Sequence, residues 1–252
     1  MDSGISRKHV PIYGMIHLAG DEPVTRALWE MRVMADEGVD GVIIENYHGG
    51  LPDVMATLNA LLIDRIDIDV GVNVLPNEYH ESIPLAAGYG GSFVQLDHVA
   101  GHYTNGTLAA DDFMEVRQAY PYISVMGGVW PKYYTPLVGS NLEDDIRDAM
   151  GRADALVVTG SGTGSETPIE KIMRFRKYAG DFPLIVGAGV TPDNAYRQLM
   201  IGDGAIVGTS LKHGDDTHAP VDRYRARDLM DVIRQVRRDK LDVSCNHYEL
   251  LG

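Results

Sequence analysis

The sequence has one cysteine, no apolar run long enough to span a membrane and no apolar core of a signal peptide near its start. The single cysteine, Cys245, excludes an intramolecular disulfide and any zinc site built from several cysteines. These absences predict a cytoplasmic protein that does not insert into a membrane.

Basic residues are also scarce relative to acidic ones. The chain has 22 Lys plus Arg against 36 Asp plus Glu, which gives a net charge of −14. Such a surface repels nucleic acids and anionic lipids, so neither is an expected partner. A small anionic metabolite is not excluded, because backbone amides can supply positive potential at a local site.

Motifs for three kinds of chemistry are missing as well. No His-Glu-x-x-His spacing is present, so no metal is expected, although four side chains could converge as ligands: His17, Glu45, Asp97 and His98. No dinucleotide fingerprint follows the first predicted strand, which disfavours hydride transfer, and no cofactor is expected. No predicted strand interior carries a lysine, which disfavours imine chemistry.

What the sequence does contain is a regular alternation of apolar runs and helical patterns. The apolar runs predict strands near 10–18, 39–45, 68–75, 93–98, 123–130, 154–159, 183–187 and 205–208. Eight such units without a linker favour one α/β domain over residues 1–252, a single (β/α)8 TIM barrel with eight parallel strands. An open doubly wound sheet is the alternative.

Capping residues and prolines set the expected helix starts. These residues are Asn77, Asp111 or Asp112, Asn141, Pro168 and Thr191. The first helix is expected to end at Gly38, and the second to span about 52–64.

The last helix has an apolar stripe over residues 226–236. Its arginines are expected in water: Arg223, Arg227, Arg234 and Arg237. Residues 241–252 are predicted to form a C-terminal tail that covers the barrel base or a partner subunit, so a homo-oligomer is possible.

Two glycine-containing loops follow the seventh and eighth predicted strands. Glycine allows the backbone to approach a ligand closely, and successive N–H groups can receive an anion. Phosphate sites of TIM barrels commonly lie after these two strands. The predicted phosphate-binding residues are Gly187, Gly189, Gly208, Thr209 and Ser210. The alternative is that the glycines only make tight turns.

Polar residues end several of the other strands, where a TIM barrel carries its chemistry. They are costly to bury unless paired, so their clustering is informative. The candidate catalytic residues are Glu45, Asp97, His98 and Lys132. The candidate substrate-binding residues are His17, Asn46, Asn73, Thr159, Gly160 and Ser161.

Each candidate also has a purely structural interpretation. Glu45 could hydrogen-bond a neighbouring loop, and Asp97 could serve only to orient a buried His98. His17 could be a satisfied structural histidine, and Lys132 could be a solvated loop lysine.

Six segments in register resemble the BtpA/SgcQ family: Tyr13–Leu18, Gly38–Asn46, Gly71–Leu75, Val157–Gly164, Gly187–Asn194 and Val207–Lys212. The resemblance runs from about Val10 to Val236 and implies a barrel of the ribulose-phosphate-binding type. The family name comes from a role in photosystem I biogenesis. In organisms without photosynthesis, the genes of relatives lie among sugar-metabolism genes. The resemblance therefore supports the fold more strongly than any reaction.

The sequence departs from this family at two strand ends. Residues 95–98 read Gln-Leu-Asp-His where relatives tend to have asparagine, and near residue 130 only Lys132 matches, without the histidine that relatives often carry. These departures allow a substrate different from that of typical members.

The combined expectation is an enzyme that uses acid–base chemistry on a phosphorylated sugar or nucleotide-like metabolite, as an isomerase, an epimerase or a lyase or glycosyl-cleaving enzyme. The alternative is a non-catalytic assembly factor or a phosphometabolite-binding protein.

Overall fold

The computed structural model describes the backbone of residues 10–249 and the side chains of residues 10–242. Eight parallel strands form a closed barrel in the order β1-β10-β9-β8-β7-β4-β3-β2. They are β1 (Ile12–Ile16), β2 (Gly41–Glu45), β3 (Asp69–Asn73), β4 (Phe93–Leu96), β7 (Ser124–Gly128), β8 (Ala155–Val158), β9 (Leu184–Val186) and β10 (Gly204–Val207). The predicted TIM barrel is confirmed.

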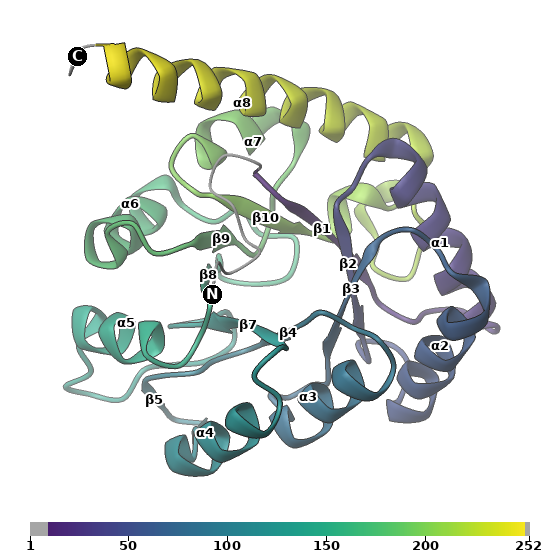
Figure 1. Ribbon diagram of the computed structural model, residues 1–252, viewed down its shortest axis with the longest axis horizontal. Helices are drawn as coiled ribbons and strands as arrows, with labels where there is room; N and C mark the ends of the chain where they lie inside the picture. The colour runs from purple at the N-terminus through teal and green to yellow at the C-terminus, as the bar shows by residue number, and fades with distance from the viewer. Residues whose placement is uncertain (1–9, 250–252) are drawn as a thin grey trace.

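A helix follows each barrel strand and packs outside the sheet (Figure 1). The helices are α1 (Pro23–Glu37), α2 (Leu51–Asp64), α3 (Tyr79–Gly88), α4 (Ala110–Ala119), α5 (Leu142–Met150), α6 (Ile169–Ala179), α7 (Pro192–Leu199) and α8 (Arg223–Glu249). Between β10 and α8 lie two short 3₁₀ helices, η1 (Thr209–Leu211) and η2 (His213–Asp215). A hairpin that the sequence did not predict, β5 (His102–Tyr103) with β6 (Gly106–Thr107), lies between β4 and α4.

Several predicted caps are confirmed. Gly38 ends α1 with a left-handed φ of 91°, and its N–H reaches the carbonyls of Met34 and Ala35. Asn141 caps α5 by accepting the N–H of Glu143 at 2.9 Å. The predicted cap at Thr191 also precedes a helix, since α7 begins at Pro192.

Three predicted helix starts are wrong by one or two residues. α3 begins at Tyr79 after Glu78, because the side chain of Asn77 hydrogen-bonds the backbone of His98 instead of capping the helix.

α4 begins at Ala110, so Asp111 and Asp112 lie in its first turn, where a negative charge favours the helix dipole. α6 begins at Ile169, which makes Pro168 the residue before the helix.

Alternate residues of the strands fill the barrel interior. Tyr13 and Phe93 meet there with ring centroids 4.9 Å apart. Gly71 makes room for this contact, since a Cβ at that position would lie 2.1 Å from the Phe93 ring. The remaining members of this buried cluster are Met15, Ile43, Met126, Ala155, Val157, Ile185 and Ile206. Because side chains alternate along a strand, the inward series continues past this layer to the C-terminal strand ends.

α8 buries its apolar stripe against the barrel as predicted, with Ala226, Leu229, Met230, Ile233 and Val236 all inside. The prediction that Arg237 stays in water is wrong. Its guanidinium donates to Asp40 Oδ2 at 2.5 Å and to the Val10 carbonyl at 3.1 Å. Arg237 therefore joins α8 to the segments that precede β1 and β2.

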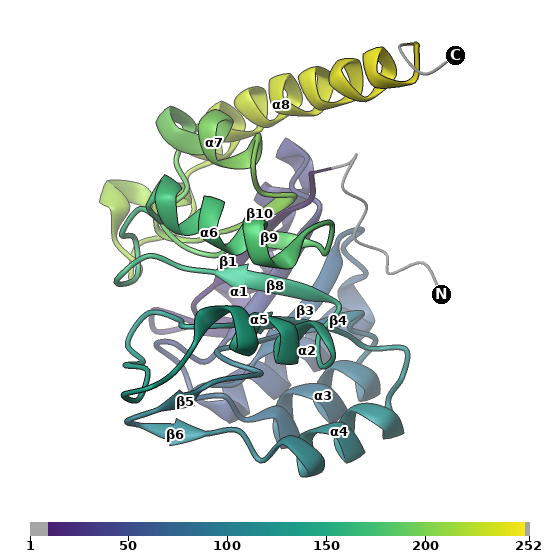
Figure 2. The ribbon, with the colours of Figure 1, turned by 90° about the vertical axis from the view of Figure 1, so that its left-hand side faces the viewer.

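The predicted tail is helical through Glu249, since α8 continues without a break and extends past the barrel (Figure 2). Residues 1–9 and 250–252 lie outside the described residues, as does the side chain of Cys245. None of the helices in the described part of the chain combines the length and apolar character that a membrane crossing requires.

Candidate functional site

Two adjoining chambers lie at the C-terminal ends of the barrel strands. The larger, the glycine chamber, has a volume of about 190 Å³. Its lining includes Gly187, Gly189, Gly208, Thr209, Ser210, Thr163, Gly164, His17 and Asp215. The smaller, the carboxylate chamber, has a volume of about 90 Å³, and its lining includes Gln95, Asp97, Thr159, Leu75 and Tyr133. Residues that line both chambers include Glu45, Lys132, Tyr47 and Met15, so the two chambers adjoin.

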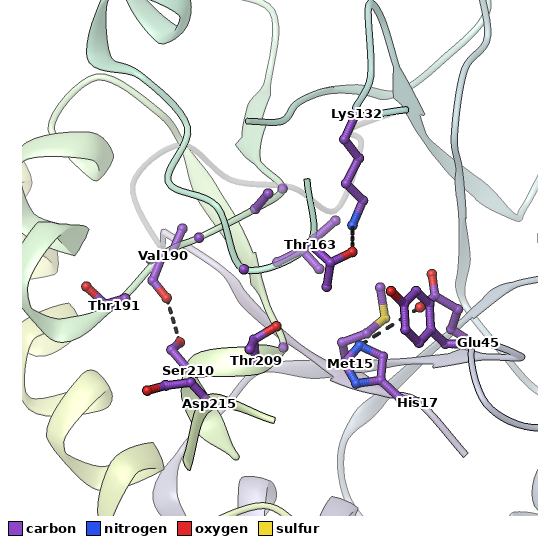
Figure 3. Close-up of a pocket in the computed structure, with 17 residues that line it drawn as sticks. Met15, His17, Glu45, Lys132, Thr163, Val190, Thr191, Thr209, Ser210 and Asp215 are labelled. Carbon is purple, nitrogen blue, oxygen red and sulfur yellow. Dashed lines mark hydrogen bonds and ion pairs between the residues drawn. The ribbon is translucent and has the colours of Figure 1, made fainter. Parts of the chain in front are cut away.

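Figure 3 shows how side chains from distant parts of the sequence meet at the glycine chamber. His17 and Glu45 lie on one side, and Ser210 lies on the other. Lys132 extends toward Thr163, to which its Nζ donates a hydrogen bond of 3.1 Å. All five residues predicted to bind phosphate line this chamber.

Glycine is required at two positions of the chamber for different structural reasons. A Cβ at Gly208 would lie 3.1 Å from His17 Cε1, so a side chain there would press into the chamber wall. Gly189 has a φ of +63°, and a Cβ there would lie 2.3 Å from the Ser165 backbone. Gly189 thus permits the β8–α6 loop to pack against the β9–α7 loop.

The hydroxyl of Ser210 already donates to the Val190 carbonyl at 2.6 Å. The proton of the Ser210 hydroxyl is therefore already used within the protein. The N-terminus of α7, marked by Thr191, also lines the glycine chamber and adds the positive end of a helix dipole.

The loop after β8 contributes residues other than those predicted. Gly160 and Ser161 line neither chamber, whereas Thr163 and Gly164 line the glycine chamber. Gly160 is packed within its own loop, since a Cβ there would lie 2.6 Å from the Ser165 carbonyl oxygen. Thr159 lines the carboxylate chamber, and its Oγ1 accepts the N–H of Lys132 at 2.8 Å.

Glu45 is a buried carboxyl group with two polar neighbours. Its Oε1 accepts from Asn73 Nδ2 at 2.9 Å, and its Oε2 lies 4.0 Å from His17 Nε2. Burial raises the pKa of Glu45 to about 7, and nearby Asp97 adds to the rise, while Lys132 and the Asn73 bond oppose it. A carboxyl group with this pKa can both take and give a proton near neutral pH.

Asn73 lies behind Glu45 and lines neither chamber. Its Nδ2 also donates to Gln95 Oε1 at 2.7 Å, so a fully buried amide links β2, β3 and β4. Asn46 is likewise outside both chambers, because its Oδ1 accepts the N–H of Leu75 at 2.7 Å. Both residues position the strand ends.

His17 is a neutral, buried imidazole at the edge of the glycine chamber. Burial lowers its pKa to about 2, and the positive charges of Lys212 and Lys132 act in the same direction. Its contact with Glu45 is therefore not an ion pair. His17 Nδ1 has no hydrogen-bond partner among the described residues.

Asp97 and His98 point in different directions from the end of β4. Asp97 lines the carboxylate chamber and accepts a hydrogen bond of 3.1 Å from the Tyr134 hydroxyl. Burial raises the pKa of Asp97, while the Tyr134 bond and Lys132 oppose the rise.

His98 lines neither chamber, and its ring packs against those of Tyr103 and Tyr134 with centroid distances of 5.0 Å to each. Its burial lowers its pKa to about 4. The geometry therefore supports Tyr134, and not His98, as the group that contacts Asp97.

Sequence reasoning missed several lining residues. Gln95 was detectable, because it lies two residues before Asp97 on the same inward series. Tyr47, Thr163 and Tyr133 come from loops, whose course no periodic pattern reveals.

Lys171 of α6 was missed too. Its Nζ donates to the carbonyls of Trp130 and Thr159 at 2.9 and 2.8 Å, and its burial lowers its pKa to about 8. It holds together the strand ends that carry Lys132 and Thr159.

Within the described residues, no group of three or more His, Cys, Asp or Glu side chains is placed to hold a metal ion. The four side chains considered from the sequence do not form such a group, since His98 faces away from the chambers.

The model of the BtpA family matches residues 11–235. This chain belongs to the BtpA family. It is 25% identical to the photosystem I biogenesis protein BtpA of Synechocystis, over 92% of this chain and 91% of that protein. It is 29% identical to an uncharacterised protein of Pyrococcus abyssi, over 90% of this chain and 97% of the relative.

Among solved structures, the phosphoribosylanthranilate isomerase of Thermus thermophilus is similar to this BtpA-family chain, with a TM-score of 0.61 and 14% identity. The match covers 90% of this chain and 100% of the isomerase chain. At this identity the likeness concerns the fold alone.

Proposed function

We propose that this BtpA-family protein is an enzyme that binds a phosphorylated small molecule and acts on it by acid–base chemistry. The observation that carries the proposal is that Glu45 and Lys132 line the same chamber as Gly208 and Thr209. A phosphate held by the loops after β9 and β10 would bring the rest of the molecule toward Glu45 and Asp97.

The charges in the site suit proton transfer. Glu45, with its pKa near 7, would remove a proton from a carbon next to a carbonyl or anomeric centre. Asp97, held by Tyr134, would serve as the second acid–base group. The ammonium of Lys132 would stabilise negative charge that develops on the substrate oxygen. Isomerisation, epimerisation or cleavage at such a centre fits this set, and we expect it in the cytoplasm.

The first experiment is a thermal-shift screen of sugar phosphates, nucleotides and the matching unphosphorylated compounds. A ligand that binds only the native state raises the melting temperature. We expect stabilisation by phosphorylated compounds only, and stabilisation by unphosphorylated compounds alone would show that the phosphate assignment is wrong.

The second experiment measures turnover of the compounds that bind. Glu45→Gln and Asp97→Asn should each reduce the rate by roughly 10²–10⁴, the usual contribution of a positioned acid or base, with phosphate-dependent binding retained. Glu115→Gln, an exposed carboxylate on α4, is the matched control and should leave turnover unchanged. Full activity in both site variants would contradict the proposed chemistry.

A second candidate is a non-catalytic assembly factor, which the name of the Synechocystis relative favours. In that case the phosphorylated ligand would bind without being converted, and Glu45→Gln and Asp97→Asn would leave assembly unaffected. Conversion of any ligand by the wild-type protein would show that the protein is an enzyme.

A further inference from the structure

The charges around the two chambers are distributed unevenly. The described residues that line the chambers include one lysine, Lys132, and no arginine. Glu45 and Lys132 line both chambers. The glycine chamber has one further carboxylate, Asp215, which Arg225 pairs at 2.7 Å. The further carboxylate of the carboxylate chamber is Asp97, which accepts from the Tyr134 hydroxyl and shares Lys132 with Glu45 as its nearby cation.

We propose that the site selects a compound with a single phosphate whose other end is uncharged and carries hydroxyl or carbonyl groups, and that it rejects compounds with a carboxylate or a second phosphate at that end. This inference rests on the proposed function, because it takes the phosphate to lie in the glycine chamber.

Compounds with a second anionic group are rejected because the carboxylate chamber has few cations. Lys132 lines both chambers, so a phosphate in the glycine chamber and the two carboxylates share its charge. A second anion in the carboxylate chamber would lie beside Glu45 and Asp97 without a cation of its own. Like charges brought together in a partly buried site repel strongly, since water screens them poorly there.

Other nearby cations do not relieve this shortage. Lys171 Nζ is directed at the carbonyls of Trp130 and Thr159. Lys212 Nζ lies 3.2 Å from both oxygens of Glu30 and is buried with it. Neither amine lines a chamber.

The carboxylate chamber is well suited to bind hydroxyl groups of a ligand. When ionised, Glu45 and Asp97 accept hydrogen bonds, which sugar hydroxyls donate, and the protonated form of Glu45 can also donate one. Gln95 lines the chamber with its Oε1 already bonded to Asn73, so its amide nitrogen is left to donate to a ligand oxygen. Tyr47 and Tyr133 also line the wall, and the Tyr133 hydroxyl is bonded to Thr163. An uncharged polyol or carbonyl end finds both acceptors and donors here.

The test compares phosphorylated ligands that differ at the end opposite the phosphate. Calorimetric titration of the full chain at pH 8, where the Glu45 carboxyl is mainly ionised, would use inorganic phosphate, pentose 5-phosphates, the corresponding pentonate 5-phosphates and pentose 1,5-bisphosphates. We expect the pentonate phosphates and bisphosphates to bind at least about tenfold more weakly than the best pentose monophosphate, a loss in keeping with like-charge repulsion in such a site.

Removing a carboxylate charge should weaken the discrimination. In Glu45→Gln and in Asp97→Asn the ratio of pentose phosphate affinity to pentonate phosphate affinity should fall severalfold, and in Glu115→Gln it should stay at the wild-type value.

The outcomes separate the inference from the function on which it rests. If pentonate phosphates or bisphosphates bind the wild-type protein as tightly as the monophosphates, the inference is overturned and the phosphate site remains. If the variants keep the full wild-type ratio, the two carboxylates do not cause the selection, and the inference is again overturned. If neither inorganic phosphate nor any phosphorylated compound binds, the proposed function falls with it.

Discussion

At the scale of single residues, the buried carboxyl of Glu45 links catalysis to stability. Its pKa is raised from an ordinary value of 4.5 to about 7, mainly by burial. A raised pKa means that the folded state holds its proton more tightly than the unfolded state does. This group therefore does not oppose folding below about pH 4.5, and its opposition grows between about pH 4.5 and 7 and levels off above 7.

The first prediction follows from the upward direction of the Glu45 pKa shift. Glu45→Gln removes the ionisable group and keeps an oxygen that can accept from Asn73. The variant should gain stability relative to the wild type as the pH rises from 5 to 8, by up to roughly 3 kcal/mol in the free energy of unfolding. Urea denaturation across this range would measure the gain. Glu115→Gln is the control, and a constant difference between Glu45→Gln and wild type at all pH values would contradict the raised pKa.

Residue spacing explains what the sequence could and could not reveal about the site. Gln95 of β4 and Asp97 just after it both face inward, and strand alternation predicts that placement. The same alternation directs His98 away from the chambers, so treating Asp97 and His98 as one unit was a mistake about direction. The partner of Asp97, Tyr134, comes from a loop and could be found only in three dimensions.

At the scale of elements, the β9–α7 loop depends on one glycine. Gly189 has a φ of +63°, and any Cβ there would overlap the Ser165 backbone. A side chain at this position has both an unfavourable backbone conformation and a steric conflict with a neighbouring loop.

The second prediction concerns Gly189→Ala. We expect a loss of more than about 1 kcal/mol in stability, together with weaker phosphate binding, because the β8–α6 and β9–α7 loops must separate. Gly214→Ala is the matched control, since Gly214 has a φ of +64° and nothing within 4 Å of the added Cβ. Thermal unfolding and phosphate titration of both variants would measure the difference. Equal effects would show that backbone conformation alone matters and that the loop contact does not.

The elements themselves could largely be predicted from the sequence, because each barrel strand is a short apolar run bounded by helical periodicity. The predictions that failed depended on tertiary contacts. Asn77 was expected to cap α3, but its side chain is bound to the His98 backbone. The hairpin of β5 and β6 has only two residues in each strand, too few for a periodic pattern.

At the scale of the whole molecule, the net charge of −14 opposes the approach of an anionic ligand. The glycine loops, the N-terminus of α7 and Lys132 can favour a phosphate only once it is close to the chamber. The surface field acts over a longer range, and salt screens it. The screening length is about 30 Å at 0.01 M ionic strength and about 8 Å at 0.15 M.

The last prediction rests on the difference in range between the surface field and the local groups of the chamber. If the surface field slows the encounter, the association rate constant of a pentose 5-phosphate should rise, by roughly two- to fivefold, as NaCl increases from 10 to 150 mM. Stopped-flow measurement of intrinsic tyrosine and tryptophan fluorescence would follow binding of the pentose 5-phosphate, and the control would replace NaCl with an uncharged solute, which should not raise the rate constant. The dissociation rate constant should change little, because the contacts inside the chamber are poorly screened. A rate constant that falls with salt would mean that local cations such as Lys132 and Arg225 attract the ligand more strongly than the acidic surface repels it.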